Sequence, residues 1–100
     1  MITRIVKMTF EERHTAHFWA VMNEVHDKIL ATKGCRELRV FHAVQQPEIV
    51  FTISSWNNVD DLENYRKSEL FKQTWSTVKP LFKSKAEAWT LVENHTAKKQ

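Results

Sequence analysis

The stretch from Ser54 to Trp75, SSWNNVDDLENYRKSELFKQTW, decides how this chain folds. It reads as the end of a β-strand, a turn and two helices in succession. Asn58 and Ser68 are favoured helix N-cap residues, because their side-chain oxygens accept hydrogen bonds from backbone N–H groups of the first turn. The stretch therefore predicts a strand-to-helix corner followed by a second helix.

Aromatic rings gather at this corner. The stretch holds four of the chain's eleven phenylalanine, tyrosine and tryptophan residues, which are Trp56, Tyr65, Phe71 and Trp75. A small domain that lines one corner with rings has either a thick core or a pocket there. Phe71 and Trp75 continue an apolar stripe at helical spacing, and Pro80 predicts that regular helix stops near Val78.

The N-terminal part of the chain predicts one strand and one long helix. Apolar and polar residues alternate within residues 2–10, which is the period of a strand. Residues 13–32 carry apolar side chains at helical spacing, namely Phe18, Val21, Met22, Val25, Ile29 and Leu30. Gly34 is the only glycine and follows where this period stops. Glycine readily takes the left-handed conformation that often ends a helix.

Three further strands are expected over residues 36–44, 49–56 and 86–93, with a hairpin turn between the first two. If Val44 pairs with Ile49, every second residue of the hairpin shares a face of the sheet. The core-like face then carries Leu38, Val40, His42, Val44, Ile49, Phe51 and Ile53. The other face carries Glu37, Arg39, Phe41, Ala43, Val50, Thr52, Ser54 and Trp56.

The element order β-α-β-β-α-β predicts an α+β fold of the ferredoxin-like type. Such a fold has a four-stranded antiparallel sheet with its helices on one face. The opposite face would expose Phe41, Val50 and Trp56, and monomers rarely leave a large apolar patch in water. We therefore expect a homodimer in which two such sheet faces pack together.

Length and composition narrow the class of protein. One hundred residues fit one domain, which we expect to span residues 1–94 with a flexible tail over residues 95–100. Only Cys35 is present, and no apolar run reaches the length of a signal peptide or membrane span, so we expect a cytoplasmic protein without membrane contact. The net charge of +3 is spread along the chain, which does not favour a nucleic-acid partner. One glycine is too few for a Gly-rich phosphate loop.

Several motifs resemble those of the antibiotic biosynthesis monooxygenase (ABM) family of the dimeric α/β-barrel group. They are Gly34-Cys35 after the long helix, Ser54-x-Trp56 at the end of a strand, and Tyr65-x-x-Ser68-x-x-Phe71-x-x-x-Trp75. The resemblance covers residues 2–92. The family includes cofactor-free oxygenases of phenolic or quinol-like substrates, haem-degrading enzymes and members without known activity. The resemblance therefore implies a dimeric α/β barrel and a small-molecule substrate.

The resemblance also implies roles for single residues. In cofactor-free members the tryptophan that resembles Trp56 lines the substrate pocket, and some of them carry an asparagine at the position of Thr52. Haem-degrading members use an asparagine of the first strand together with a tryptophan and an iron-ligating histidine. The last two positions look like Tyr65 and Trp75 here, and the first strand has no asparagine. The haem-degrading set of residues is therefore incomplete.

His42 is the most informative polar residue. It lies between Val40 and Val44 on the core-like face, where a histidine could take a proton near neutral pH. The alternatives are a core histidine that is hydrogen-bonded to a neighbour, or a register error that places His42 on the outside. His14 and His17 have the spacing of half a metal site, but no third ligand follows at suitable spacing. We therefore expect no metal, and the resemblance to cofactor-free ABM members implies no organic cofactor.

The resemblance implies a cofactor-independent monooxygenase of the ABM type that acts with O₂ on a small aromatic or quinol-like substrate. His42 or Thr52 would supply the catalytic polar contact. The substrate pocket would be formed by Trp56, Tyr65, Phe71 and Trp75. A non-catalytic small-ligand-binding or stress-related dimer on the same fold is the alternative, and a haem-binding or haem-degrading relative ranks third.

Overall fold

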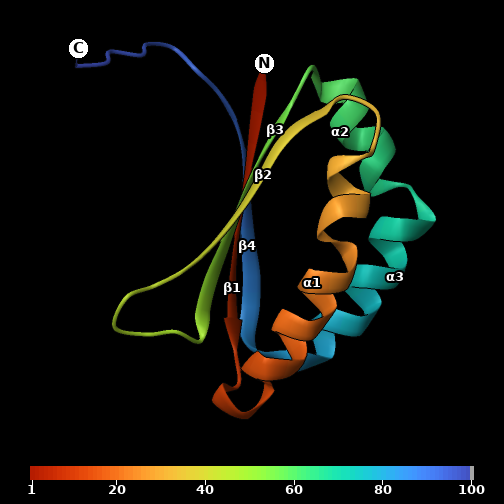
Figure 1. Cartoon of the computed structure of the whole chain (residues 1–100), viewed down its shortest axis with the longest axis vertical. Helices are drawn as coiled ribbons and strands as arrows, with labels where there is room; N and C mark the ends of the chain where they lie inside the picture. The colour runs from red at the N-terminus through yellow and green to blue at the C-terminus, as the bar shows by residue number, and fades with distance from the viewer. Residues whose placement is uncertain (100) are drawn as a thin grey trace.

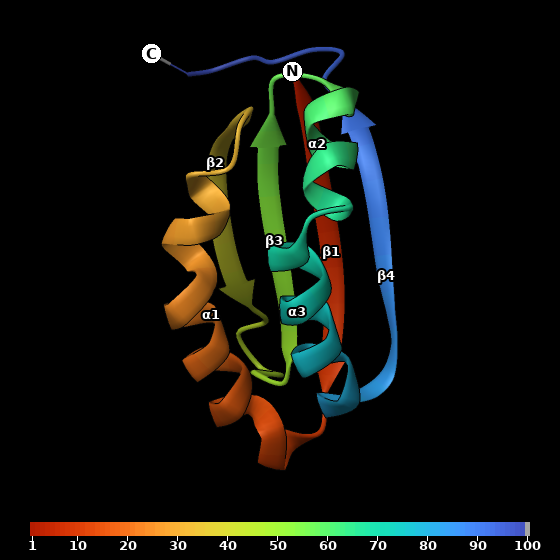
Figure 2. The same cartoon turned by 90° about the vertical axis from the view of Figure 1, so that its right-hand side faces the viewer.

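The computed structural model describes residues 1–99 and contains one four-stranded antiparallel sheet. The strands are β1 (Ile2–Phe10), β2 (Cys35–His42), β3 (Ile49–Trp56) and β4 (Phe82–Val92). Their order in the sheet is β2-β3-β1-β4, so β2 and β4 are the edge strands (Figure 2). This order confirms the predicted ferredoxin-like α+β fold. β4 begins four residues earlier than residue 86, where the sequence predicted its start.

Three helices lie on one face of the sheet, as Figure 1 shows edge-on. They are α1 (Thr15–Leu30), α2 (Val59–Arg66) and α3 (Glu69–Val78), with short 3₁₀ turns at Glu12–His14 and Lys79–Leu81. Within residues 1–99 no helix covers the opposite face (Figure 1). None of the helices in these residues is both long and apolar enough to span a membrane.

The predicted caps of the two short helices are both confirmed. The Asn58 side chain accepts a hydrogen bond of 2.8 Å from the backbone N–H of Asp61 at the start of α2. Ser68 Oγ accepts one of 3.2 Å from the N–H of Phe71 at the start of α3. These bonds satisfy helix N–H groups that have no partner within the helix.

Gly34 has the predicted left-handed conformation, with φ of 84°. It does not follow the helix directly, however, because α1 ends at Leu30 and its C-cap residue Ala31 keeps helical angles. Gly34 instead closes the turn between α1 and β2. A Cβ at this position would collide with the Asp61 side chain. Glycine is thus required both by the positive φ and by the close approach of α2.

The pairing of β2 with β3 differs from the prediction by one residue. His42 pairs with Val50 and Phe41 with Phe51, so the predicted pairing of Val44 with Ile49 is wrong. The hairpin closes earlier, because the N–H of Ala43 donates to the carbonyl oxygen of Ile49 at 2.9 Å. Val44 therefore lies in the loop and is 94% exposed.

This slip reverses the predicted faces of β3, because side chains alternate along a strand. The helix-facing residues of β3 are Val50, Thr52, Ser54 and Trp56, of which Val50 and Trp56 have no exposed surface. The bare face instead carries the residues predicted to be core, Ile49, Phe51 and Ile53, beside Phe41 of β2. The main core lies between the sheet and the helices and includes Met8, Phe10, Phe18, Met22 and Val78.

Candidate functional site

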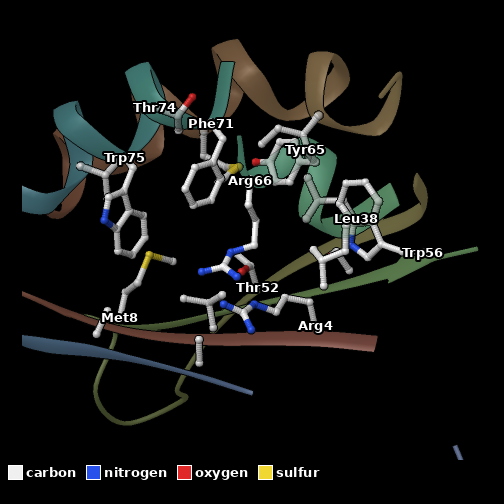
Figure 3. Close-up of a pocket in the computed structure, with 18 of the residues that line it drawn as sticks. Arg4, Met8, Leu38, Thr52, Trp56, Tyr65, Arg66, Phe71, Thr74 and Trp75 are labelled. Atoms are coloured by element: carbon white, nitrogen blue, oxygen red, sulfur yellow. The ribbon is translucent and has the colours of Figure 1, made fainter. Parts of the chain in front are cut away.

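A cavity of about 340 Å³ lies between the helix-facing side of the sheet and the helices. Its floor comes mainly from β1, β3 and β4, with Leu38 added from β2, and its roof comes mainly from α2 and α3 (Figure 3). The volume lies within the range of small-molecule sites. β3 contributes to this cavity because Thr52, Ser54 and Trp56 point toward the helices, the opposite of the predicted orientation.

Aromatic rings form one continuous wall of the cavity. Trp56 stacks on Tyr65 with 5.0 Å between ring centroids, and Tyr65 meets Phe71 edge-on at 5.3 Å. Phe71 then stacks on Trp75 at 6.0 Å. Phe71 and Trp75 are four residues apart on α3, so helical geometry places both rings on one face. The wall offers flat apolar surface to a ligand.

The indole N–H of Trp56 is already occupied within the protein. It donates a hydrogen bond of 3.0 Å to the Ser54 hydroxyl, and both residues are buried. The structure favours Trp56 as apolar wall, since a donor that is already paired gains little from a second acceptor.

Tyr65 brings a hydroxyl to the cavity wall, on the side turned to Phe71 (Figure 3). Burial, followed by the nearby thiol of Cys35, raises the pKa of Tyr65 to about 12. The hydroxyl therefore stays protonated across the physiological pH range and is available as a hydrogen-bond donor. It is not suited to take a proton as a general base at neutral pH.

Two arginines also line the cavity, Arg4 from β1 and Arg66 from the last turn of α2. Figure 3 shows both side chains reaching into the space between sheet and helices. Arg66 Nη1 lies 3.1 and 3.3 Å from the two carboxylate oxygens of Glu63. Arg4 Nη1 donates to the Thr90 hydroxyl at 2.7 Å. Burial first, and then the charge of Arg66, lower the pKa of Arg4, while Glu63 partly opposes this.

The sequence profile of the antibiotic biosynthesis monooxygenase family matches residues 1–75. This chain belongs to the ABM family. The fold of the ABM protein is shared by solved structures, although no curated protein matches its sequence.

One similar structure is a conserved protein from Methanosarcina mazei Go1, with a TM-score of 0.88, 18% identity and 94% of each chain covered. A proposed antibiotic biosynthesis monooxygenase from Deinococcus radiodurans has a TM-score of 0.89 at 14% identity, covering 100% of this chain and 99% of its own. Another from Nitrosomonas europaea has a TM-score of 0.88 at 12% identity, covering 95% and 100%. At these identities the likeness shows the fold alone.

Most of the residues predicted from the sequence of the ABM protein come together in its structure. Thr52 and the four predicted pocket residues Trp56, Tyr65, Phe71 and Trp75 all line the cavity. His42 does not. It faces the helix side, as predicted, but at the end of the edge strand β2, where it is exposed and lies 6.2 Å from the ring of Trp19. The structure therefore gives no support to His42 as a catalytic residue of this cavity.

Arg4 and Arg66 were not among the site residues predicted from the sequence. A signal for Arg4 was present, because it falls in phase with Ile2, Val6 and Met8, which face the helices. A charged residue in the apolar phase of a central strand is unusual unless it has a partner or a function. Arg66 has no such signal, because α2 is short and polar and shows no clear apolar stripe.

Proposed function

We propose that this ABM protein is a cofactor-independent monooxygenase that oxidises a small aromatic or quinol-like substrate with O₂ in the aromatic cavity. The main support is the cavity itself, an apolar space of about 340 Å³ walled by Trp56, Tyr65, Phe71 and Trp75. Such rings hold a flat substrate by stacking and keep bulk water away from the reacting carbon.

The chemistry asks little of the protein once the substrate is an anion. A deprotonated phenol or enol is electron-rich enough to react with O₂. When a CH₂ group of such a substrate becomes C=O, one oxygen atom enters the product and the other leaves as water, so the substrate supplies both electron pairs. In this proposal Thr52 and the protonated Tyr65 hydroxyl orient the substrate oxygen, because both hydroxyls belong to residues that line the cavity.

The direct test is O₂ uptake by the purified protein with a panel of quinols and anthrones. We expect uptake above the rate in protein-free solution. The variant Thr74→Trp fills the cavity from α3 and should lower the rate at least about tenfold, since small displacements of a substrate are costly. Lys72→Trp is the matched control, because Lys72 is exposed on the same helix and does not line the cavity. Uptake at the background rate across the panel would refute the proposal.

A non-catalytic ligand-binding protein is the second candidate, and one observation favours it. The described residues that line the cavity include no aspartate, glutamate or histidine. The cavity therefore lacks the side chains that most often accept a proton near neutral pH. A quinol or quinone analogue that binds in the cavity without any O₂ uptake would support this candidate over the oxygenase.

We also infer a homodimer that closes over the bare face of the sheet, defined here as the face opposite the helices. This bare face carries Phe41, Trp89 and Leu91, which are 42%, 45% and 43% exposed. Phe51, Ile53 and Ile5 extend it across the central strands. Burial of such a patch against a second copy is favourable, and a two-fold arrangement lets the same patch serve both subunits.

A further inference from the structure

The two arginines of the cavity carry a charge that residues 1–99 do not fully balance. Arg66 is paired with Glu63, at 3.1 Å between Nη1 and Oε1. Arg4 has no carboxylate within ion-pair distance among residues 1–99, and its hydrogen-bond acceptor Thr90 is neutral. Two guanidinium groups and one carboxylate leave one net positive charge at this part of the cavity.

The two like charges, placed beside an apolar lining, favour an anionic ligand. The lining is otherwise mainly apolar, and a charge in such surroundings loses part of its hydration. The two guanidinium groups also repel each other, which contributes to the lowered pKa of Arg4. Arginine nevertheless remains protonated in proteins, so the repulsion is not relieved by loss of a proton.

Unused hydrogen-bonding capacity is present as well. Nε of Arg66 is buried and has no hydrogen-bond partner among residues 1–99. An atom buried this deeply is not reached from the cavity, but the hydrogen bonds that Arg66 makes within residues 1–99 come from Nη1 alone, which leaves Nη2 for an acceptor supplied by a ligand. A guanidinium group suits an oxyanion in particular, because its N–H groups match the geometry of two oxygen lone pairs.

We propose that the cavity binds an aromatic ligand through an anionic oxygen, held jointly by Arg4 and Arg66 with the rings of Trp56 to Trp75 around its apolar body. This ligand class rests on the proposed function only because both use the same cavity. Binding of an oxyanion does not require turnover. Both a carboxylate and an ionised phenol supply the required group.

The proposal also explains how a cavity without a carboxylate or histidine can produce a reactive anion. Two cationic groups beside a phenol stabilise its ionised form and lower the pKa of the ligand. The O–H bond then breaks with its electron pair staying on the ligand oxygen, and the proton passes to solvent water. No protein base has to accept it.

Matched ligands test the charge requirement by titration calorimetry. 2-Naphthoate and 2-naphthamide have the same ring system and nearly the same shape, but only the first is an anion. We expect naphthoate to bind about tenfold to a hundredfold more tightly, as charge-assisted hydrogen bonds do. 4-Nitrophenol serves as the phenol arm, because its ionised form has a distinct visible absorbance. Its apparent pKa should fall on binding.

Three variants test the residues, and one of them is expected to strengthen binding. Arg4→Gln should abolish the preference for naphthoate, whereas Arg4→Lys should keep part of it. Glu63→Gln removes the carboxylate that neutralises Arg66, so naphthoate should bind more tightly, a gain that an unfolded protein could not show. Arg13→Gln is the control, because Arg13 is exposed in the 3₁₀ turn before α1 and does not line the cavity.

Equal affinity for naphthoate and naphthamide would overturn the proposal, and so would equal effects of Arg4→Gln and Arg13→Gln. The outcome can be separated from that of the oxygenase proposal. O₂ uptake with neutral quinols and no preference for anions would leave the oxygenase standing and remove the oxyanion site. Tight binding of naphthoate without O₂ uptake on any substrate would support the oxyanion site and remove the oxygenase.

Discussion

At the scale of single residues, the cavity depends on which polar groups are satisfied inside the protein. The Trp56 indole N–H is paired with Ser54, which removes it as a substrate contact. The Tyr65 hydroxyl and the guanidinium groups of Arg4 and Arg66 belong to residues that line the cavity. His42 was predicted as a site residue because it alternates with apolar residues on one strand face. It lies at the end of an edge strand, and alternation does not show this position. The cavity is therefore a donor-rich site, suited to an acceptor.

The ionisation of Tyr65 can be measured directly, because it is the only tyrosine in the chain. We expect its tyrosinate absorbance in the folded protein to rise with a midpoint near pH 12, the pKa that burial gives it. In urea the midpoint should return to about 10, the usual value. A midpoint near 10 in protein that is still folded would show that Tyr65 is solvated.

The same shift predicts how stability depends on pH. The folded state binds the Tyr65 proton more tightly than the unfolded state, so the resulting stabilisation is fully present below about pH 10. It is lost as the pH rises toward 12. Tyr65→Phe should abolish this part of the alkaline loss in urea unfolding curves. The same alkaline dependence in both proteins would assign the effect to other groups.

At the scale of elements, the β2–β3 hairpin shows why a more apolar strand face is not always the core. The bare face of β3 holds Ile49, Phe51 and Ile53, whereas its helix-facing side holds Thr52 and Ser54. A rule that assigns the more apolar face to the core therefore chooses wrongly here. The polar residues belong inside because they line a cavity, and the apolar ones belong outside if a second subunit covers them.

One serine, Ser68, stabilises the junction of α2 and α3 through two hydrogen bonds. Ser68 Oγ accepts from the N–H of Phe71 and donates to the carbonyl oxygen of Tyr65 at 2.6 Å. Ser68→Ala should lower the free energy of unfolding by about 1 kcal/mol, the usual cost of a lost N-cap. Ser76→Ala is the control, because Ser76 is exposed within α3 and caps nothing. Equal urea midpoints for the two variants would contradict this role.

At the scale of the whole molecule, all three helices shield one face of the sheet and leave the other bare (Figure 1). The bare face is not uniformly apolar, since Lys7 and Glu87 approach each other there at 3.7 Å. Aromatic and aliphatic residues lie on both sides of this pair. The bare face therefore resembles the core of a protein interface that contains a few polar groups. A second copy of the chain would complete the apolar layer that one chain leaves open.

The proposed dimer can be tested by changing one exposed ring. Trp89→Lys places a charge in the bare face and should weaken self-association at least about tenfold, because tryptophans often dominate interfaces. Light scattering over a range of concentrations measures the mass. Val59→Lys is the control, because Val59 is 48% exposed on α2, away from the bare face. A wild-type protein that stays monomeric at micromolar concentration would exclude the dimer.

The sequence by itself determined the order of elements, the caps at Asn58 and Ser68 and the left-handed Gly34, because each follows from interactions within a few residues. It also determined that Phe71 and Trp75 lie together, since both share one face of any helix that contains them. Only the tertiary structure decided which face of β3 meets the helices, because a hairpin shifted by one residue exchanges the two faces. Only the tertiary structure, too, brought Arg4 and Arg66 into one cavity, because β1 and α2 are distant in sequence and meet only when the sheet has formed.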